Sequence, residues 1–322
     1  MRGRKKSKFL WRRIFFCLFI LIILIWFIAL LISNIFSKDK NNKSDSSLTS
    51  SKADNTINAN YEYLETDSTL INAGNLILVN HDYAYTAPAP SSGDLTNLVD
   101  YRQGLSSKNF SVKDNTVLLS NLIVNDFNTM MTDFAVNTNI KNLIVASGLR
   151  TKEYQQTLYD ADLTKNNATV STLVAIPGHS EHHTGYALDF SYNDNFKNNS
   201  KWLNENAYKY GFIQRYADDK KEITKIDNEP WHYRYVGQPH AYYMKENNLC
   251  LEEYINSLKQ YTFTKEHLKI NNFDGVEYEV YYIPATKEKT KIPAPKICDN
   301  YSISGNNVDG FIVTVQVSQN KQ

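Results

Sequence analysis

The most apolar stretch of the chain is residues 14–32, a run without charged or strongly polar side chains. Its length matches the roughly 20 residues that a helix needs to cross the hydrocarbon layer of a membrane. Seven lysine and arginine residues precede the run, and such residues are retained on the cytoplasmic side. The pattern therefore predicts a cytoplasmic tail over residues 1–13 and a single-pass anchor in the cell membrane over residues 14–36, with the remainder of the chain extracellular.

A cleaved signal peptide is the alternative reading of this run. It would need a shorter apolar core followed by a small-residue cleavage site. The residues that follow the core are Ser-Asn-Ile-Phe, so we favour an uncleaved anchor. Residues 37–60 are then almost entirely polar, and such a segment cannot bury enough surface to offset the entropy lost on ordering. We predict a flexible stalk there.

From residue 61 onward, apolar positions recur with the periods of helices and strands. Residues 115–134 place apolar side chains at helical spacing, residues 201–210 also look helical, and Thr151 is placed to cap a further helix. Four shorter runs are typical of strands: residues 75–79, 143–145, 185–190 and 231–236. We therefore expect one mixed domain of helices and strands over residues 61–250.

The pattern changes after residue 251. Residues 276–283 and 310–317 are rich in β-forming side chains, and a segment of proline and lysine, residues 284–295, separates them. We predict a small β appendage over residues 251–322. Cys250 and Cys298 could form a disulfide outside the cell, but two unpaired thiols are equally open, because spacing in sequence does not tell whether two Cα atoms approach.

The net charge of the chain indicates which kinds of partner it could bind. The chain has 35 basic residues, of which seven precede the apolar run, so 28 remain against 34 acidic residues, a net charge of −6. Binding to phosphates needs clustered positive charge. The mildly acidic body therefore argues against nucleic acid as a partner.

Candidate chemistry is concentrated in two short segments. Three of the seven histidines lie within residues 177–189, and His232 follows three residues after Glu229. Imidazole and carboxylate are the usual ligands of a catalytic zinc ion, which keeps one position open for water, and a nearby glutamate can take a proton from that water. Taken singly, each residue has a simpler interpretation: a surface histidine, an aspartate paired with lysine, or a glutamate in an exposed turn.

Taken together, their order resembles the zinc-dependent D-alanyl-D-alanine carboxypeptidases of the VanY type. The L,D-carboxypeptidases that trim cell-wall tetrapeptides carry the same motifs. The matching residues are Ser147-Gly148-Leu149-Arg150 with Gln155, then Ser180-x-His182-x-x-Gly185-x-Ala187-x-Asp189, and finally Glu229-x-Trp231-His232-x-Arg234. One departure is Leu149, which stands where the family commonly has tyrosine and would alter a pocket wall without touching the chemistry.

The resemblance implies a role for each matching residue. His182, Asp189 and His232 would bind Zn²⁺, and Glu229 would act first as general base and then as the acid that protonates the leaving amine. Arg150 would stabilise the oxyanion or anchor the substrate. The remaining substrate contacts implied are Gln155, Ser180 and Trp231. His179 and His183 stay ambiguous, although His183 would point to the opposite face if the strand begins there.

The resemblance also implies an α+β fold, with helices beside an antiparallel sheet and the metal in a cleft across it. The substrate would be a peptidoglycan stem peptide ending in D-alanine. Three alternatives are an L,D-carboxypeptidase acting on tetrapeptides, an endopeptidase that cuts crosslinks, and a non-catalytic wall-binding protein. None of the expected ligands and catalytic residues is missing, which favours an enzyme. The β appendage could bind wall polymer or brace the domain, and we favour bracing.

Overall fold

The computed structural model of the chain describes residues 60–296 and 300–319. Apart from Asn60, these residues belong to one compact unit, Tyr61–Gln322. The predicted tail and anchor, and the stalk except for Asn60, lie outside the described residues. Within the described part of the chain, no helix is both long enough and apolar enough to cross a membrane.

A five-stranded sheet forms the centre of the first half of this unit. Its order is β3-β5-β6-β8-β7, and only the β3–β5 pair is parallel. The strands are β3 (Ser111–Val112), β5 (Ile144–Ser147), β6 (Ala187–Phe190), β8 (Glu229–Tyr235) and β7 (Phe212–Tyr216). The expected α+β fold with an antiparallel sheet is confirmed, with one parallel pair at its edge.

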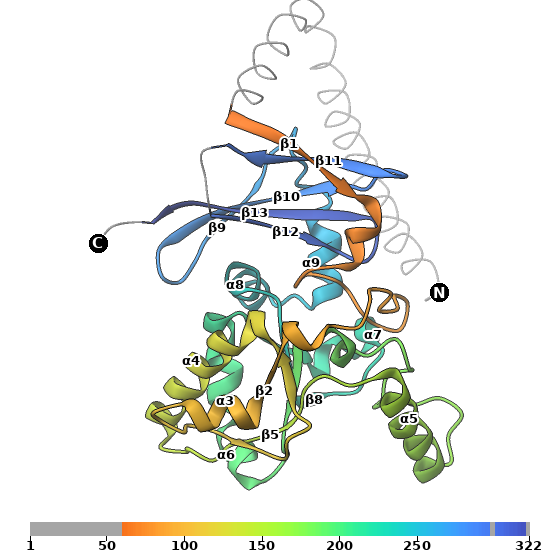
Figure 1. Ribbon diagram of the computed structural model, residues 1–322, viewed down its shortest axis with the longest axis vertical. Helices are drawn as coiled ribbons and strands as arrows, with labels where there is room; N and C mark the ends of the chain where they lie inside the picture. The colour runs from red at the N-terminus through yellow and green to blue at the C-terminus, as the bar shows by residue number, and fades with distance from the viewer. Residues whose placement is uncertain (1–59, 297–299, 320–322) are drawn as a thin grey trace, which may run out of the picture. The chain divides into compact units, whose positions relative to one another are not determined.

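Helices cover this sheet and supply much of its core. On α4 (Asn121–Thr138), Phe127, Met130 and Phe134 are fully buried and belong to the same hydrophobic cluster as Phe190 of β6. The other helices of this half are α3 (Leu98–Gly104), α5 (Lys152–Asn166), α6 (Asp194–Asn206) and α7 (Lys221–Thr224), with short 3-10 turns η2 (Ser92–Asp94), η4 (Ala207–Tyr210) and η5 (Asp218–Lys220). Figure 1 shows α5 standing out to one side of the sheet.

The helix predicted over residues 115–134 begins later than expected. Residues 118–120 form β4 (Leu118–Ser120), which pairs with β2 (Leu95–Asn97), and α4 starts only at Asn121. The Ser120 hydroxyl accepts a hydrogen bond from the backbone N–H of Leu122 and so caps the helix. The predicted helix over residues 201–210 corresponds to the second half of α6 and to η4.

The strand predicted over residues 75–79 is wrong. Leu76 to Val79 are buried, as expected, but the chain there runs between the two halves of the unit without a neighbouring strand among the described residues. Side chains and loops take up its backbone groups instead: Arg234 donates to the carbonyl oxygens of Asn75 and Ile77, and Ser304 Oγ accepts from Leu76 N–H at 2.9 Å. A run of apolar residues indicates that a segment is buried, and this segment is buried without pairing to another strand.

The second half of the unit is a β layer. A four-stranded antiparallel sheet has the order β12-β13-β10-β9, with β9 (Leu268–Asn271), β10 (Val276–Pro284), β12 (Tyr301–Gly305) and β13 (Gly310–Gln319). A separate pair joins β1 (Tyr61–Asp67) to β11 (Lys289–Pro295), so part of the expected proline and lysine connector is a strand. Figure 1 shows β1 lying along β11, although more than 200 residues separate them in sequence.

Two helices pack beneath this layer. On α9 (Leu251–Leu258), Tyr254 and Leu258 share a hydrophobic cluster with Met244 of α8 (Gln238–Glu246) and with Val280 of β10. The β layer also contains β1, whose residues come long before residue 250. The predicted boundary at residue 250 between the domain and the appendage therefore stays a prediction. Cys250 is a buried free thiol, whereas Cys298 lies outside the described residues.

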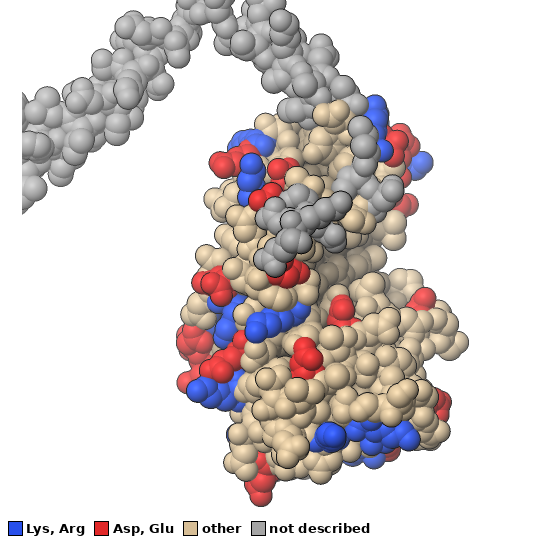
Figure 2. Space-filling view, turned by 90° about the vertical axis from the view of Figure 1, so that its left-hand side faces the viewer, with Lys and Arg blue, Asp and Glu red and all other residues tan. Residues whose placement is uncertain are grey.

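Figure 2 shows acidic and basic side chains intermixed over the face that it draws. Without the seven basic residues that precede the apolar run, the chain has 28 basic against 34 acidic residues, so charges of both signs are expected on its surface. Phosphate backbones are bound by clustered positive charge. This face therefore gives no support to a nucleic-acid partner.

Candidate active site

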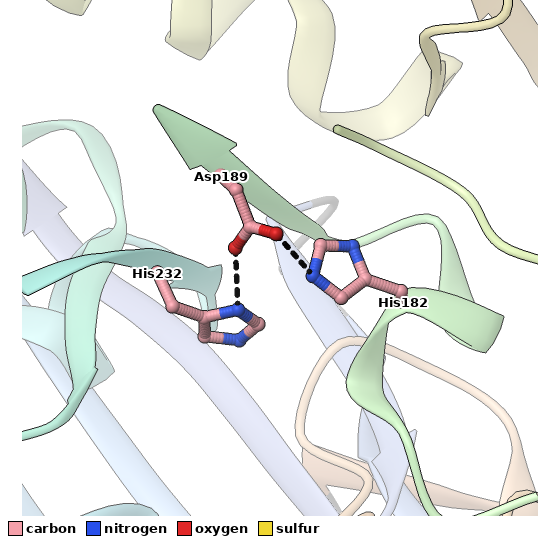
Figure 3. A group of neighbouring side chains, drawn as sticks. All are labelled: His182, Asp189 and His232. Carbon is pink, nitrogen blue, oxygen red and sulfur yellow. Dashed lines mark hydrogen bonds and ion pairs between the residues drawn. The ribbon is translucent and has the colours of Figure 1, made fainter. Parts of the chain in front are cut away.

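Three side chains converge at the centre of the five-stranded sheet. Asp189 of β6 and His232 of β8 are direct cross-strand partners in the antiparallel register, and His182 lies just before β6 in the 3-10 turn η3 (Glu181–Thr184). One possible ligand atom from each lies within 4.8 Å of the others. In Figure 3 the Asp189 carboxylate lies between the two imidazoles, with one oxygen facing each ring.

Local backbone geometry explains the spacing of this motif. The Ser180 hydroxyl accepts a hydrogen bond from the backbone N–H of His182 and caps η3. The turn ends at Gly185, whose φ of +73° lies in the left-handed region that favours glycine. The chain then enters β6, which places Asp189 seven residues after His182 and on the same side of the site.

Each imidazole directs one ring nitrogen at Asp189, and its other ring nitrogen lies close to a second oxygen. His182 Nδ1 lies 2.6 Å from the carbonyl oxygen of Gly148, and its Nε2 lies 3.1 Å from Asp189 Oδ2. His232 Nδ1 lies 2.9 Å from Asp189 Oδ1, and its Nε2 lies 3.2 Å from Glu181 Oε2. An acceptor on the far nitrogen is the usual way in which a metal-binding histidine is oriented.

The donor set fits a zinc ion. His182 Nε2 is buried and makes no hydrogen bond with any described residue, so this nitrogen has a lone pair to offer to a cation. Two imidazole nitrogens and one carboxylate oxygen are a common catalytic zinc set, with the fourth position left for water or substrate. The three residues that the sequence analysis assigned to the metal are therefore together in space.

The surroundings of the two histidines shift their pKa values in opposite directions. Burial lowers the pKa of His182 to about 4, and the nearby Arg150 adds to this effect, which keeps the ring neutral. Burial opposes the charged form of His232, but hydrogen bonds to Asp189 and Glu181 raise its pKa to about 9. A metal cation at Nδ1 would take the place of that proton.

Glu229 stands at the start of β8, next to the three candidate ligands. Its Oε2 lies 4.0 Å from His232 Nδ1, and its side chain is buried. Burial raises the pKa of Glu229 to about 8, although the neighbouring His232 opposes the shift. A carboxyl group with a pKa near neutrality can both accept and donate a proton.

The Ser147-Gly148-Leu149-Arg150 segment begins with the last residue of β5 and forms a second wall of the site. Arg150 Nε donates to Ser147 Oγ at 2.9 Å, and its Nη2 pairs with Asp189. At Gly148 an added Cβ would lie 2.1 Å from the backbone oxygen of Leu118. Only glycine fits this close approach, which brings the Gly148 carbonyl to His182.

A cavity of about 340 Å³ opens at the site. Its lining includes every residue that the sequence analysis assigned to the site: Arg150, Gln155, Ser180, His182, Asp189, Glu229, Trp231 and His232. Gln155 Nε2 donates to the carbonyl oxygen of Ala175 at 2.9 Å, while its buried Oε1 has no partner among the described residues. A second cavity of about 840 Å³ shares Arg150, Asp189 and Trp231 with the first.

The two ambiguous histidines brace loops. His183 accepts a hydrogen bond from the N–H of Gly178 at 3.0 Å, and its Nδ1 lies 2.8 Å from the carbonyl oxygen of Arg150. His179 Nδ1 lies 2.7 Å from the carbonyl oxygen of Asn80. His183 lies in η3, and the strand expected over residues 185–190 starts at Ala187, so no strand begins at His183.

Sequence reasoning missed a set of buried side chains behind His232. Glu181 occupied an unassigned position of the motif, and Arg234 was part of a motif but had no role. Arg215 and Tyr216 of β7 lie outside the motifs, although the Tyr216 ring is 5.0 Å from that of His232. Nothing in the local pattern could have placed Arg215 and Tyr216 here, because β7 reaches the site only through sheet pairing.

Comparisons with known proteins show which family the chain resembles. A sequence model of the family VanY, D-alanyl-D-alanine carboxypeptidase, matches residues 116–238. A D-alanyl-D-alanine carboxypeptidase of Enterococcus faecium is 38% identical over 246 residues, which cover 75% of each chain.

Solved structures are similar as well. One is the structure of the vancomycin-resistance D,D-dipeptidase VanXYg in complex with a D-Ala-D-Ala phosphinate analogue. Its sequence is 33% identical, and the match covers 80% of this chain and 99% of that chain with a TM-score of 0.68. The structure of a mutant D,D-pentapeptidase VanY in complex with Zn(II) is 35% identical and covers 56% of this chain and 99% of that chain, with a TM-score of 0.46. The extended match to the E. faecium enzyme, together with the match to the VanY family model, shows that the chain belongs to the D-alanyl-D-alanine carboxypeptidases of the VanY family, hydrolases that act on peptide bonds.

Proposed function

We propose that the chain removes the terminal D-alanine from peptidoglycan stem peptides at a zinc site formed by His182, Asp189 and His232. The observation that carries this proposal is the convergence of two imidazoles, two carboxyl groups and Arg150 on one cavity. When bound, zinc supplies Lewis-acid chemistry, since it acidifies water and polarises a carbonyl group.

Glu229 is the group that moves the proton. Its carboxyl group lies beside the ligands, and the raised pKa, about 8, allows it to hold a proton near neutral pH. In the proposal it accepts a proton from the attacking water and later gives it to the leaving amine of D-alanine. Both transfers suit an acid whose pKa is close to the working pH.

Arg150 and the cavity walls position the substrate. Arg150 lines both cavities, and its guanidinium can hold the oxygen of the scissile carbonyl. Gln155 Oε1 has no partner among the described residues and faces a buried environment, which fits it to accept from an N–H of the peptide. Apolar side chains of Leu158 and Ala161 in the first cavity suit the methyl group of D-alanine.

The ligand in the similar VanXYg complex supports a D,D-carboxypeptidase. That protein holds a D-Ala-D-Ala analogue. We therefore place a pentapeptide ending in D-Ala-D-Ala in this site, outside the cell, with the predicted apolar run at residues 14–32 as a membrane anchor.

Mass spectrometry of muropeptides treated with the purified protein tests this function. We expect release of one D-alanine from pentapeptides, loss of that activity with a chelator, and its return with zinc. Glu229→Gln keeps the shape but removes the proton carrier, and should lower the rate by at least about 100-fold. Glu205→Gln, at an exposed ion pair with Lys201 on α6, is the matched control and should keep the wild-type rate.

The products discriminate between the alternatives. Release from tetrapeptides alone would replace the D,D reading with an L,D-carboxypeptidase. Cleavage of crosslinked dimers without loss of a terminal D-alanine would indicate an endopeptidase. Equal inactivity of the wild-type and Glu229→Gln proteins would exclude the carboxypeptidase function.

A further inference from the structure

Buried charged side chains extend from His232 away from the cavity. Glu181 is fully buried, and its Oε2 lies 3.2 Å from His232 Nε2, the nitrogen that faces away from Asp189. Its other oxygen, Oε1, accepts hydrogen bonds of 2.8 Å from Arg215 Nε and from Arg234 Nη1. Glu181 therefore holds His232 with one oxygen and is itself held by two arginines with the other.

Arg215 carries this connection to another element. Its Nη1 and Nη2 donate to the two carboxylate oxygens of Glu252 at 2.9 and 2.6 Å, a bidentate pair. Glu252 lies in the first turn of α9, the helix that packs under the C-terminal β layer. The path from Glu252 through Arg215 and Glu181 thus joins the start of the predicted appendage to a candidate metal ligand.

Burying charged side chains costs free energy, so stability alone does not explain this chain of ion pairs. Arg215 and Glu181 are both fully buried, and a buried ion pair stabilises a fold little better than apolar side chains of similar size. Its advantage is geometric, because a bidentate guanidinium fixes the direction of a carboxylate. Here the bidentate pair joins Arg215 to Glu252, and Nε of the guanidinium fixed in this way donates to Glu181. Glu181 in turn accepts from His232, and such partners orient metal ligands and raise their basicity.

We propose that Glu181, Arg215 and Glu252 form a positioning chain that keeps His232 Nδ1 directed at the metal and makes zinc affinity depend on α9. The proposal rests on the metal site proposed above. It assigns to the segment after residue 250 a part in the catalytic centre, beyond bracing the domain.

Two neighbouring glutamates on α9 provide a matched test. Glu252→Gln keeps the size of the side chain but removes the charge that holds Arg215. Glu253→Gln makes the same change one residue later, where the carboxylate pairs with Lys220 at 2.9 Å. With zinc affinity measured in the full-length protein by competition with a chromophoric chelator, we expect Glu252→Gln to bind about 10-fold more weakly and Glu253→Gln to match the wild type.

A second measurement separates positioning from a general loss of stability. The visible spectrum of the cobalt(II) form reports the geometry of the ligands, and Glu252→Gln should shift it while Glu253→Gln does not. Glu181→Gln, closer to His232, should weaken zinc binding by about 10- to 100-fold. If Glu181→Gln fails to fold, Glu252→Gln still decides the outcome.

The outcomes distinguish this inference from the function on which it rests. Absence of zinc binding in the wild-type protein would overturn the proposed metal site. Wild-type zinc affinity and an unchanged cobalt spectrum in Glu252→Gln, beside a zinc-binding wild type, would overturn the positioning chain alone. A lower melting temperature of Glu252→Gln without metal, with unchanged affinity, would likewise reduce the chain to a structural role.

Discussion

At the scale of single residues, the candidate site depends on backbone positions as much as on its ligands. Gly148 lets the chain after β5 approach the backbone of Leu118, and its carbonyl oxygen then holds His182 Nδ1. Gly185 allows the turn that separates His182 from the strand carrying Asp189. Both glycines belong to the motifs, and their role is conformational.

A substitution at Gly148 tests this dependence. In Gly148→Ala the new Cβ would meet the Leu118 backbone oxygen at 2.1 Å, so the loop must move. We expect a loss of about 1–3 kcal/mol in the free energy of unfolding, measured in urea, together with weaker zinc binding. Gly104→Ala is the control, because its Cβ meets no described atom within 4 Å and should leave both quantities near the wild type.

At the scale of elements, α5 is a wall of the cavity held by few buried contacts. Gln155 is its one buried residue, and the helix begins with the Thr151 hydroxyl accepting from the N–H of Tyr154 at 3.1 Å. A helix with so little buried surface depends strongly on its cap. The position of Gln155 in the cavity therefore depends on Thr151.

Removing this cap should loosen the helix. Thr151→Ala should lower the free energy of unfolding by about 1 kcal/mol and speed amide hydrogen exchange in the first turn of α5. Thr157→Ala, the same change at an exposed position of the same helix, should stay within about 0.5 kcal/mol of the wild type. Equal exchange rates in the two variants would contradict a role for the cap.

At the scale of the whole unit, His240 joins α8 to α9 and to the β layer. It lies on α8, with Nδ1 2.7 Å from the hydroxyl of Tyr254 on α9 and Nε2 3.0 Å from that of Thr314 on β13. Burial lowers the pKa of His240 to about 3. The neutral ring is therefore part of the junction between α8, α9 and the β layer.

This junction should make the protein sensitive to acid. Below pH 6.5 the unfolded chain takes up a proton at His240 that the folded protein refuses until about pH 3, so stability falls as the pH falls through that range. Between pH 7 and pH 5 we expect this histidine to cost about 2 kcal/mol of the free energy of unfolding. Urea unfolding at the two pH values should show this loss reduced in His240→Gln and unchanged in His81→Gln, which alters an exposed histidine.

The sequence alone determined which residues meet at the site and what kind of elements carry them. Motif spacing brought His182, Asp189 and Glu229 to attention, and all lie on one cavity with His232. This was possible because a turn and a strand translate short sequence separations into fixed positions. Helical and strand periods similarly predicted α4, β6, β8 and β10, with errors chiefly at their ends.

The tertiary structure alone decided which distant segments became neighbours. The pairing of β1 with β11, the unpaired course of residues 76–79, and the contacts of Arg215 with Glu181 and Glu252 all join residues far apart in the chain. Hydrophobic periodicity reports that a residue is buried, but a buried face fits many partners. Only the packing of the complete chain selects among them, and here that selection placed the carboxylate of Glu181 behind His232.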